Sequence, residues 1–145
     1  MPNEQAHIEL ANRNKATLRH LLADKAAHAE WIATVAFYRA VHLVEAIFAI
    51  KGGHGGDHGK RHDRLKKAYP NLWGSYRLLW SLSTIARYMK QPQEFGGKEY
   101  TSFLGYLNGQ DVQTVVADNL LLTLESKIRS SNFLSPASCK ALGLP

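Results

Sequence analysis

The chain has 145 residues, of which 45% are hydrophobic and 21% charged, and it carries a formal net charge of +6. A chain of this length forms one domain, and this composition excludes a disordered or fibrous protein. The single cysteine, Cys139, excludes an internal disulfide and a zinc site built from several thiolates. The polar N-terminal residues lack the apolar run of an export signal, so we expect a cytoplasmic protein.

The positive charge is concentrated in one segment. Between Lys51 and Lys67, six lysines and arginines stand against two aspartates. Such a cluster attracts polyanions, including RNA and nucleotides. The same residues also suit an ordinary solvated helix face, so both interpretations stay open.

Two long helices are predicted in the first third of the chain. The first begins after Asn3, its expected N-cap, and ends at about Asp24. The second, from about Ala27 to Ile50, is apolar around most of its circumference, which requires neighbours on several sides. It has the length of a membrane span, but three charged or polar residues lie at its centre: Arg39, His42 and Glu45. Because charges are costly within lipid, we expect a core helix and no membrane contact.

Shorter elements and two further long helices complete the predicted domain. A short helix is expected near Lys60–Tyr69, and a long helix begins after Pro70, with Asn71 as its N-cap, and ends at about Lys90. Glycines then predict a long irregular connection. Asp111 caps a last long helix, whose apolar residues recur at four-residue steps: Val112, Val116, Leu120, Leu124 and Ile128. A short tail covers about residues 133–145.

No segment alternates between apolar and polar residues as a half-buried strand does. The sequence therefore predicts a single all-α domain over residues 1–145. The short connection between the first two helices implies an antiparallel pair, and the simplest closure is an up-and-down four-helix bundle.

One stripe of the second helix is polar. Thr34, Tyr38, His42 and Glu45 follow at intervals of four, four and three residues, which places them on one side of an otherwise apolar helix. Two interpretations stand side by side. The stripe is a hydrogen-bonded network inside the core, or it faces a cleft closed by the histidine-rich connector that follows.

That connector, KGGHGGDHGKRHDR from Lys51 to Arg64, combines glycine, histidine and basic charge. It does not match a phosphate loop of the Walker type, which requires a different glycine spacing and a hydroxyl residue where Arg61 stands. A metal site is a weak alternative, with four candidate ligands: His42, Glu45, His58 and His62. The glycines oppose one continuous helix through the histidines, so the sequence predicts no cofactor and no metal as its first choice.

The stretches FYRAVHLVEAIFAIKG, DHGKRHDRL and SLSTIARY resemble the HEPN superfamily, the higher-eukaryote and prokaryote nucleotide-binding domains. The resemblance covers about Ala27 to Lys90, and Arg87 stands where the common tail has an acid. It implies a bundle of four or five helices, often homodimeric. It also implies a gene frequently encoded beside nucleotidyltransferases, or a role in toxin–antitoxin and RNA-processing systems.

Ribonuclease members of this superfamily cut RNA without metal through an Arg-x4–6-His motif. The histidine transfers protons while the arginine stabilises the phosphate. Arg13 and His20 match the spacing, but they lie in the first predicted helix, whereas the motif stands late in the bundle of nuclease members. A metal-independent endoribonuclease is therefore the alternative, with three candidate catalytic residues: His58, Arg61 and His42.

We expect a HEPN-like module that binds a nucleotide, RNA or a nucleotidyltransferase-type partner in a basic cleft. The candidate ligand-binding residues are Tyr38, His42, Glu45, His58, Arg61, Arg64 and Arg87. The first three would form a polar floor, and the arginines would bind phosphate, because guanidinium groups donate two parallel hydrogen bonds to it. His58 aligns with a histidine that these domains often carry after the second helix. A metal-binding bundle and a purely structural, dimerising bundle remain alternatives.

Overall fold

The computed structural model describes residues 2–145, and its regular structure is helical. The elements are α1 (Glu4–Leu22), α2 (Ala29–Ile50), α3 (His58–Ala68), α4 (Pro70–Tyr88), η1 (Gln93–Phe95), α5 (Phe103–Leu107), η2 (Gln113–Leu121), α6 (Leu122–Ser130) and α7 (Pro136–Leu142). Apart from one isolated bridge between Lys90 and Glu99, the described residues hold no β-structure. The predicted all-α class is confirmed.

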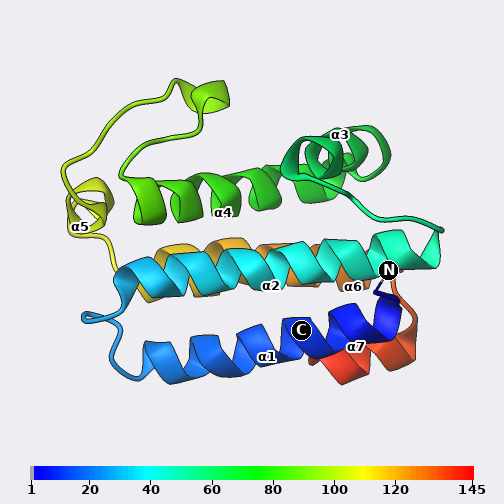
Figure 1. Cartoon of the computed structure of the whole chain (residues 1–145). Helices are drawn as coiled ribbons and strands as arrows, with labels where there is room; N and C mark the ends of the chain where they lie inside the picture. The colour runs from blue at the N-terminus through cyan, green and yellow to red at the C-terminus, as the bar shows by residue number, and fades with distance from the viewer. Residues whose placement is uncertain (1) are drawn as a thin grey trace.

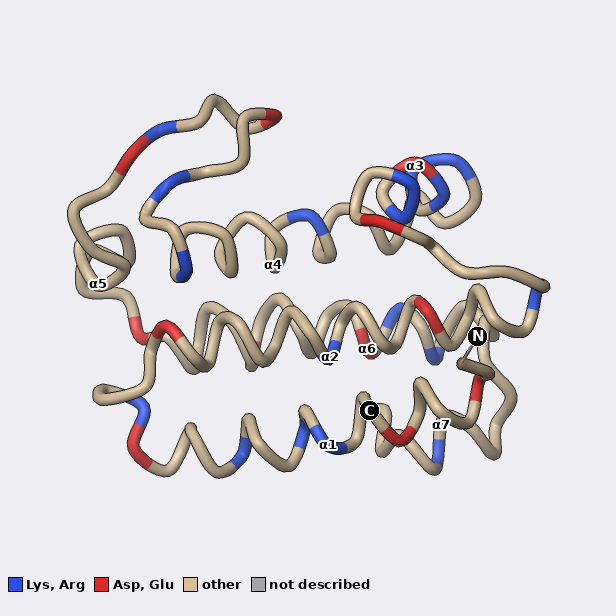
Figure 2. Tube along the Cα trace, in the orientation of Figure 1, with Lys and Arg blue, Asp and Glu red and all other residues tan. Residues whose placement is uncertain are grey.

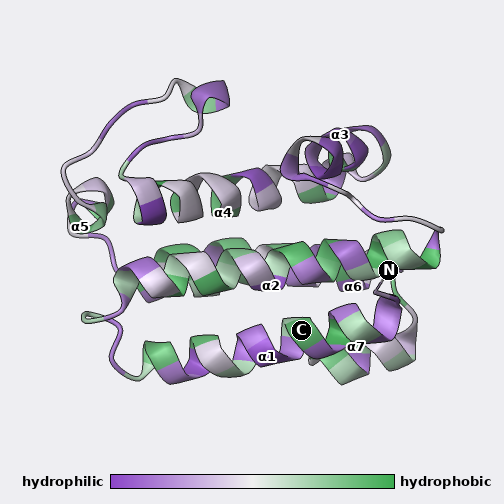
Figure 3. Cartoon of the chain, in the orientation of Figure 1, coloured by the Kyte–Doolittle hydropathy of each residue, from purple (hydrophilic) through white to green (hydrophobic). Residues whose placement is uncertain are grey.

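The central element is α2. It packs against α1 on one side and against α4 on another, and the η2–α6 segment lies behind it (Figure 1). Most of its side chains are buried, among them Phe37, Leu43 and Phe48. By length and composition α2 is also able to span a membrane, but most of its apolar stretch is buried inside the protein. Its hydrophobicity is therefore explained by its place in the core (Figure 3).

A buried ion pair crosses this core. Arg39 of α2 is fully buried and donates from Nε to Oε1 of Glu125 on α6 at 2.6 Å. Its two terminal nitrogens donate to the carbonyls of Ala11 and Leu142, each at 3.0 Å. One guanidinium thus joins α1, α2, α6 and the C-terminal end of α7, and each of its three groups has an acceptor.

Local sequence rules explain most helix starts. Asn3 accepts from Ala6 N–H at 2.9 Å, and Asp111 accepts from Thr114 N–H at 3.0 Å, so both predicted caps are confirmed. The predicted cap at Asn71 is wrong. Pro70 itself occupies the first turn of α4, where its missing N–H costs nothing, and Asn71 donates instead to Ser131 Oγ at 2.9 Å.

The ends of the predicted elements also shift. The first helix ends at Leu22 rather than Asp24, and α4 ends at Tyr88, where Met89 adopts a left-handed conformation with φ 55°. The connection after α4 was expected to be irregular but contains η1 and α5. The predicted tail contains α7, whose Cys139 and Leu142 are buried. The expected last helix is continuous, but its first part, Gln113–Leu121, is a π-helix.

Charge is distributed unevenly over these helices. Figure 2 shows Lys and Arg along α3, the short helix that follows the glycine-rich connector. This helix begins at His58 because Asp57 caps it, accepting from Lys60 N–H at 2.9 Å. Most of the basic segment is therefore one helix packed against α4, and its Arg61 and Arg64 reach Glu45 and Phe48 in the C-terminal half of α2.

Candidate functional site

The glycine-rich connector runs back over the C-terminal half of α2 (Figure 1). The backbone N–H of Gly55 lies 3.1 and 3.0 Å from the two carboxylate oxygens of Glu45. A Cβ atom at Gly55 would lie 2.5 Å from Glu45 Oε1 and 2.8 Å from Arg61 Cβ, so only glycine fits there. The connector thus covers Glu45 of the polar stripe and encloses its carboxylate, which agrees with the interpretation of a hydrogen-bonded network at this end of the stripe.

Arg61 of α3 completes this seal. Its Nε donates to Glu45 Oε1 at 2.8 Å, and both side chains are buried. Burial alone would raise the pKa of Glu45, but the hydrogen bonds from Gly55 N–H and from Arg61 reverse this, so the pKa lies below its ordinary value. Glu45 is therefore ionised and paired, and Arg61 is committed to it.

The same guanidinium orients His58. Nη1 of Arg61 lies 3.0 Å from Nδ1 of His58. Because arginine can only donate, Nδ1 is the acceptor, and the neutral ring carries its proton on Nε2. The ring packs against Phe37 at 5.9 Å between centroids. Partial burial lowers the pKa of His58, and the positive charges of Arg61 and Arg87 lower it further.

His58 and Arg87 line one recess of about 420 Å³ between α3, α4 and η1. Its lining consists of His58, Trp80, Thr84, Arg87, Tyr88, Pro92, Gln93 and Glu94. Arg87 is half-buried and held in place, since Nε donates to the carbonyl of Ser83 at 3.1 Å. Its guanidinium lies 5.2 Å from the ring of Tyr88 and 5.9 Å from that of Tyr38. The recess combines a fixed cation, a neutral imidazole and aromatic walls.

The polar stripe of α2 does not form one open floor. Tyr38 is 38% exposed beside Arg87, Glu45 is sealed, and Thr34 bonds back to Glu30 of its own helix at 2.8 Å. His42 is turned toward α1, where its Nδ1 lies 3.2 Å from Nδ1 of His7. Burial lowers the pKa of both of these imidazoles.

Two other candidate residues lie outside the recess. Arg64 stacks over Phe48 with its guanidinium 4.2 Å from the ring centre, at the C-terminal end of α2. His62 points into the interior, with its ring between those of Trp73, Tyr76 and Trp80. Burial first, and the neighbouring cations second, lower the pKa of His62 to about 4, so it stays neutral at physiological pH.

The candidate metal ligands are therefore not gathered as the sequence suggested. His58 is engaged with Arg61, and His62 is enclosed by aromatic rings. Glu45 instead comes close to His54 of the connector, with Nδ1 of the histidine 3.5 Å from Oε2. It also comes close to His7 of α1, which the sequence analysis did not select. No spacing signal links His7 to Glu45; only the packing of α1 on α2 brings them together.

Trp80, Thr84 and Glu94 were likewise not predicted as site residues. The first two share a face of α4 with Arg87, since positions three and four apart are neighbours on a helix. That signal was present in the sequence. Glu94 comes from the segment expected to be irregular, and its carboxylate lies 3.9 Å from Lys66 Nζ.

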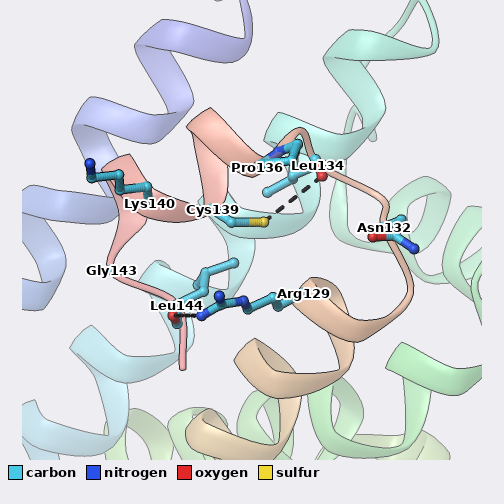
Figure 4. Close-up of a pocket in the computed structure, with 8 residues that line it drawn as sticks. All are labelled: Arg129, Asn132, Leu134, Pro136, Cys139, Lys140, Gly143 and Leu144. Carbon is cyan, nitrogen blue, oxygen red and sulfur yellow. Dashed lines mark hydrogen bonds between the residues drawn. The ribbon is translucent and has the colours of Figure 1, made fainter.

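A second cavity, of about 620 Å³, lies near the C-terminus (Figure 4). It is lined by Arg129, Asn132, Leu134, Pro136, Cys139, Lys140, Gly143 and Leu144. Arg129 is already engaged there, donating to the Leu144 carbonyl at 3.1 Å. The cavity includes none of the residues predicted to bind a ligand, and it brings no histidine or carboxylate together.

Comparisons with known proteins give no further assignment. No family model matches the chain, and neither a curated protein nor a solved structure matches it.

Proposed function

We propose that the chain is a HEPN-like helical module that binds a nucleotide or single-stranded RNA, with a phosphate held between His58 and Arg87. The observation that carries this proposal is the recess of about 420 Å³ that both residues line together with Trp80 and Tyr88. A phosphate needs a cation and hydrogen-bond donors, and a base needs an aromatic surface to stack on. The recess offers all of these.

The two polar residues have different roles in this proposal. Arg87 supplies the charge, because it has no carboxylate partner within 4.0 Å among the described residues. His58 supplies a neutral Nε2–H donor, since Arg61 occupies Nδ1. Arg61, expected from the sequence as a phosphate contact, acts instead as the residue that fixes the His58 tautomer.

Binding is favoured over RNA cleavage by this same tautomer. A general base at the 2′-hydroxyl needs a free lone pair on the histidine. The lone pair of His58 points at Arg61, and the other ring nitrogen, Nε2, bears hydrogen. His58 is thus set up to donate a hydrogen bond and not to accept a proton, which supports a binding module over a metal-independent ribonuclease.

The wider features of this class form part of the same proposal. We propose an up-and-down bundle of α1, α2, α4 and the η2–α6 segment, a homodimer in solution, and a cytoplasmic location. Support for a dimer comes from two exposed aromatic residues: Tyr88, which lines the recess and is 65% exposed, and Trp31, which lines the adjoining groove that shares Arg87 and is 62% exposed. A nucleotidyltransferase-type partner protein, the other expected ligand, would compete for this face.

The test is the affinity for a short fluorescein-labelled single-stranded RNA, measured by fluorescence anisotropy over a range of salt concentrations. Each phosphate contact contributes a slope of about −0.7 to the plot of log affinity against log salt. Arg87→Ala is expected to weaken binding at low salt by about tenfold and to reduce the slope by about one contact. Arg13→Ala removes the same charge from an exposed site on α1 and is the matched control.

Equal effects of Arg87→Ala and Arg13→Ala would show that RNA affinity depends only on the net charge of the protein, and the recess would then not be the binding site. Incubation of the same RNA in EDTA tests cleavage. If the wild type degrades the full-length RNA and His58→Ala does not, the ribonuclease alternative would replace the binding proposal.

A further inference from the structure

His7, Glu45 and His54 form a cluster that lies outside the proposed recess. They come from three separate elements: the first turn of α1, the C-terminal half of α2 and the connector before α3. Each offers one ligand atom within 4.8 Å of the other two, and His7 and Glu45 are buried. Two imidazoles and one carboxylate are the donors that Zn²⁺ takes in sites that keep a fourth position open.

His7 carries the second observation. Its Nδ1 lies 3.2 Å from Nδ1 of His42, and its Nε2 is buried with no hydrogen-bond partner among residues 2–145. Buried polar atoms without partners are rare in folded proteins and call for an explanation. If His7 donates from Nδ1 to His42, its Nε2 holds a lone pair, and metal-bound histidines commonly donate their other ring N–H in this way.

Glu45 keeps one oxygen on the histidine side. Arg61 binds Oε1, whereas Oε2 accepts from Gly55 N–H at 3.0 Å and also faces Nδ1 of His54 at 3.5 Å. A carboxylate oxygen has two lone pairs, so one remains on Oε2 for a metal ion. Ligands on a tetrahedral Zn²⁺ with bonds of about 2.0–2.1 Å lie about 3.3 Å apart. The His54–Glu45 separation is already close to this value, and the other two separations are at most 4.8 Å, so they must shorten by no more than about 1.5 Å.

The connector allows this adjustment. His54 lies between Gly53 and Gly55, and Gly53 has φ 143°, a conformation in which glycine is unstrained. His54 is thus on the most adaptable of the three elements, whereas His7 and Glu45 lie on helices of the core. His54 can therefore move toward an ion that is held between His7 and Glu45.

From these observations we propose that the chain binds one divalent transition-metal ion of the Zn²⁺ class through His7, Glu45 and His54. His42 acts as a positioning residue for His7, and Arg61 does so for Glu45. The set differs from the one suggested by the sequence, because His7 and His54 are ligands in place of His42, His58 and His62. The site does not depend on RNA binding.

The experiment uses the full chain after removal of metal with EDTA and dialysis. Zn²⁺ is titrated against a chromophoric chelator, and Co²⁺ is used to record the visible absorption that reports coordination geometry. We expect one equivalent of Zn²⁺ per chain and a Co²⁺ spectrum of a four- or five-coordinate site. His54→Ala, on the connector, is expected to weaken Zn²⁺ affinity at least about tenfold and to abolish that spectrum.

His20→Ala removes an exposed histidine of α1 and is the matched control, expected to leave the affinity unchanged. His58→Ala separates the two ligand sets, because it weakens binding only if the sequence-derived set is the correct one. His7→Asn, checked for folding by circular dichroism, tests the buried ligand. Absence of stoichiometric binding, or binding that survives His54→Ala, would overturn the proposal.

Discussion

Acid stability tests the environment of His62 most directly. The ring is 2% exposed and enclosed by Trp73, Tyr76 and Trp80, and its Nε2 has no hydrogen-bond partner among the described residues. Burial first, and then the neighbouring His58, Arg61 and Lys66, lower the pKa of His62 from 6.5 to about 4. The folded state therefore holds the neutral ring, whereas the unfolded chain takes up a proton below pH 6.5.

The sign and size of the effect follow from proton linkage. Where the unfolded state binds more protons, stability falls as pH falls, and here that range runs from about pH 6.5 down to about pH 4. Since one pKa unit corresponds to 1.36 kcal/mol, the complete shift is worth about 3 kcal/mol. Between pH 7.5 and pH 5, about 2 kcal/mol of this is expected to be lost.

Urea unfolding followed by far-ultraviolet circular dichroism measures the loss at each pH. Other groups also titrate, so the informative quantity is the difference between the wild type and His62→Phe, which keeps an aromatic ring in the same place. The variant is expected to lose about 2 kcal/mol less than the wild type between pH 7.5 and pH 5. Parallel curves for the two proteins would refute the reasoning, because His62 would then titrate equally in both states.

Two further predictions concern stability. Gly55→Ala is expected to lower the free energy of unfolding by about 1–3 kcal/mol, because the added Cβ would lie 2.5 Å from Glu45 Oε1. Gly74→Ala, whose Cβ would enter open space on α4, is the control and is expected to raise the free energy of unfolding by about 0.5–1 kcal/mol. Similar values for the two variants in urea unfolding would contradict the close packing of the connector. Glu125→Gln is expected to cost about 3–5 kcal/mol, because it leaves the charge of Arg39 buried without its partner. Combining it with Arg39→Met should restore much of this loss in thermal unfolding, and a double variant as unstable as the single one would show that the charge is not the cause.

Features that depend on residues close together in the sequence were predictable. The apolar circumference of α2 predicted a core helix, and caps such as Asn3 and Asp111 act over three residues, so both were confirmed. The prediction of Asn71 as an N-cap was wrong because Pro70, which also favours a helix start, occupies the first turn of α4. The π-helix at Gln113–Leu121 was missed. Within it the buried leucine is Leu121, whereas Leu120 of the predicted four-residue repeat is only partly buried.

The candidate site was predictable only in part, because its contacts join distant positions. His58 and Arg87 were named from a motif and from charge, and they do line one recess. Nothing in the spacing indicates that His7 approaches Glu45, because this depends on the register of α1 against α2. Composition also does not show whether an arginine is paired with a carboxylate. Arg61 is paired with Glu45, whereas Arg87 has no carboxylate partner within 4.0 Å among the described residues.

Arg61 connects the two proposed sites. Its Nε binds Glu45 and its Nη1 binds His58, so one buried guanidinium is shared between the proposed metal cluster and the recess. In the proposed function Arg87 supplies the attraction for phosphate, because Glu45 balances the charge of Arg61, and His58 contributes direction more than charge. Arg61, the arginine that the sequence motif makes most prominent, therefore holds Glu45 and His58 in place. The distinction is physical: a guanidinium that is buried and paired holds other groups in place, and one that lacks a carboxylate partner attracts the ligand.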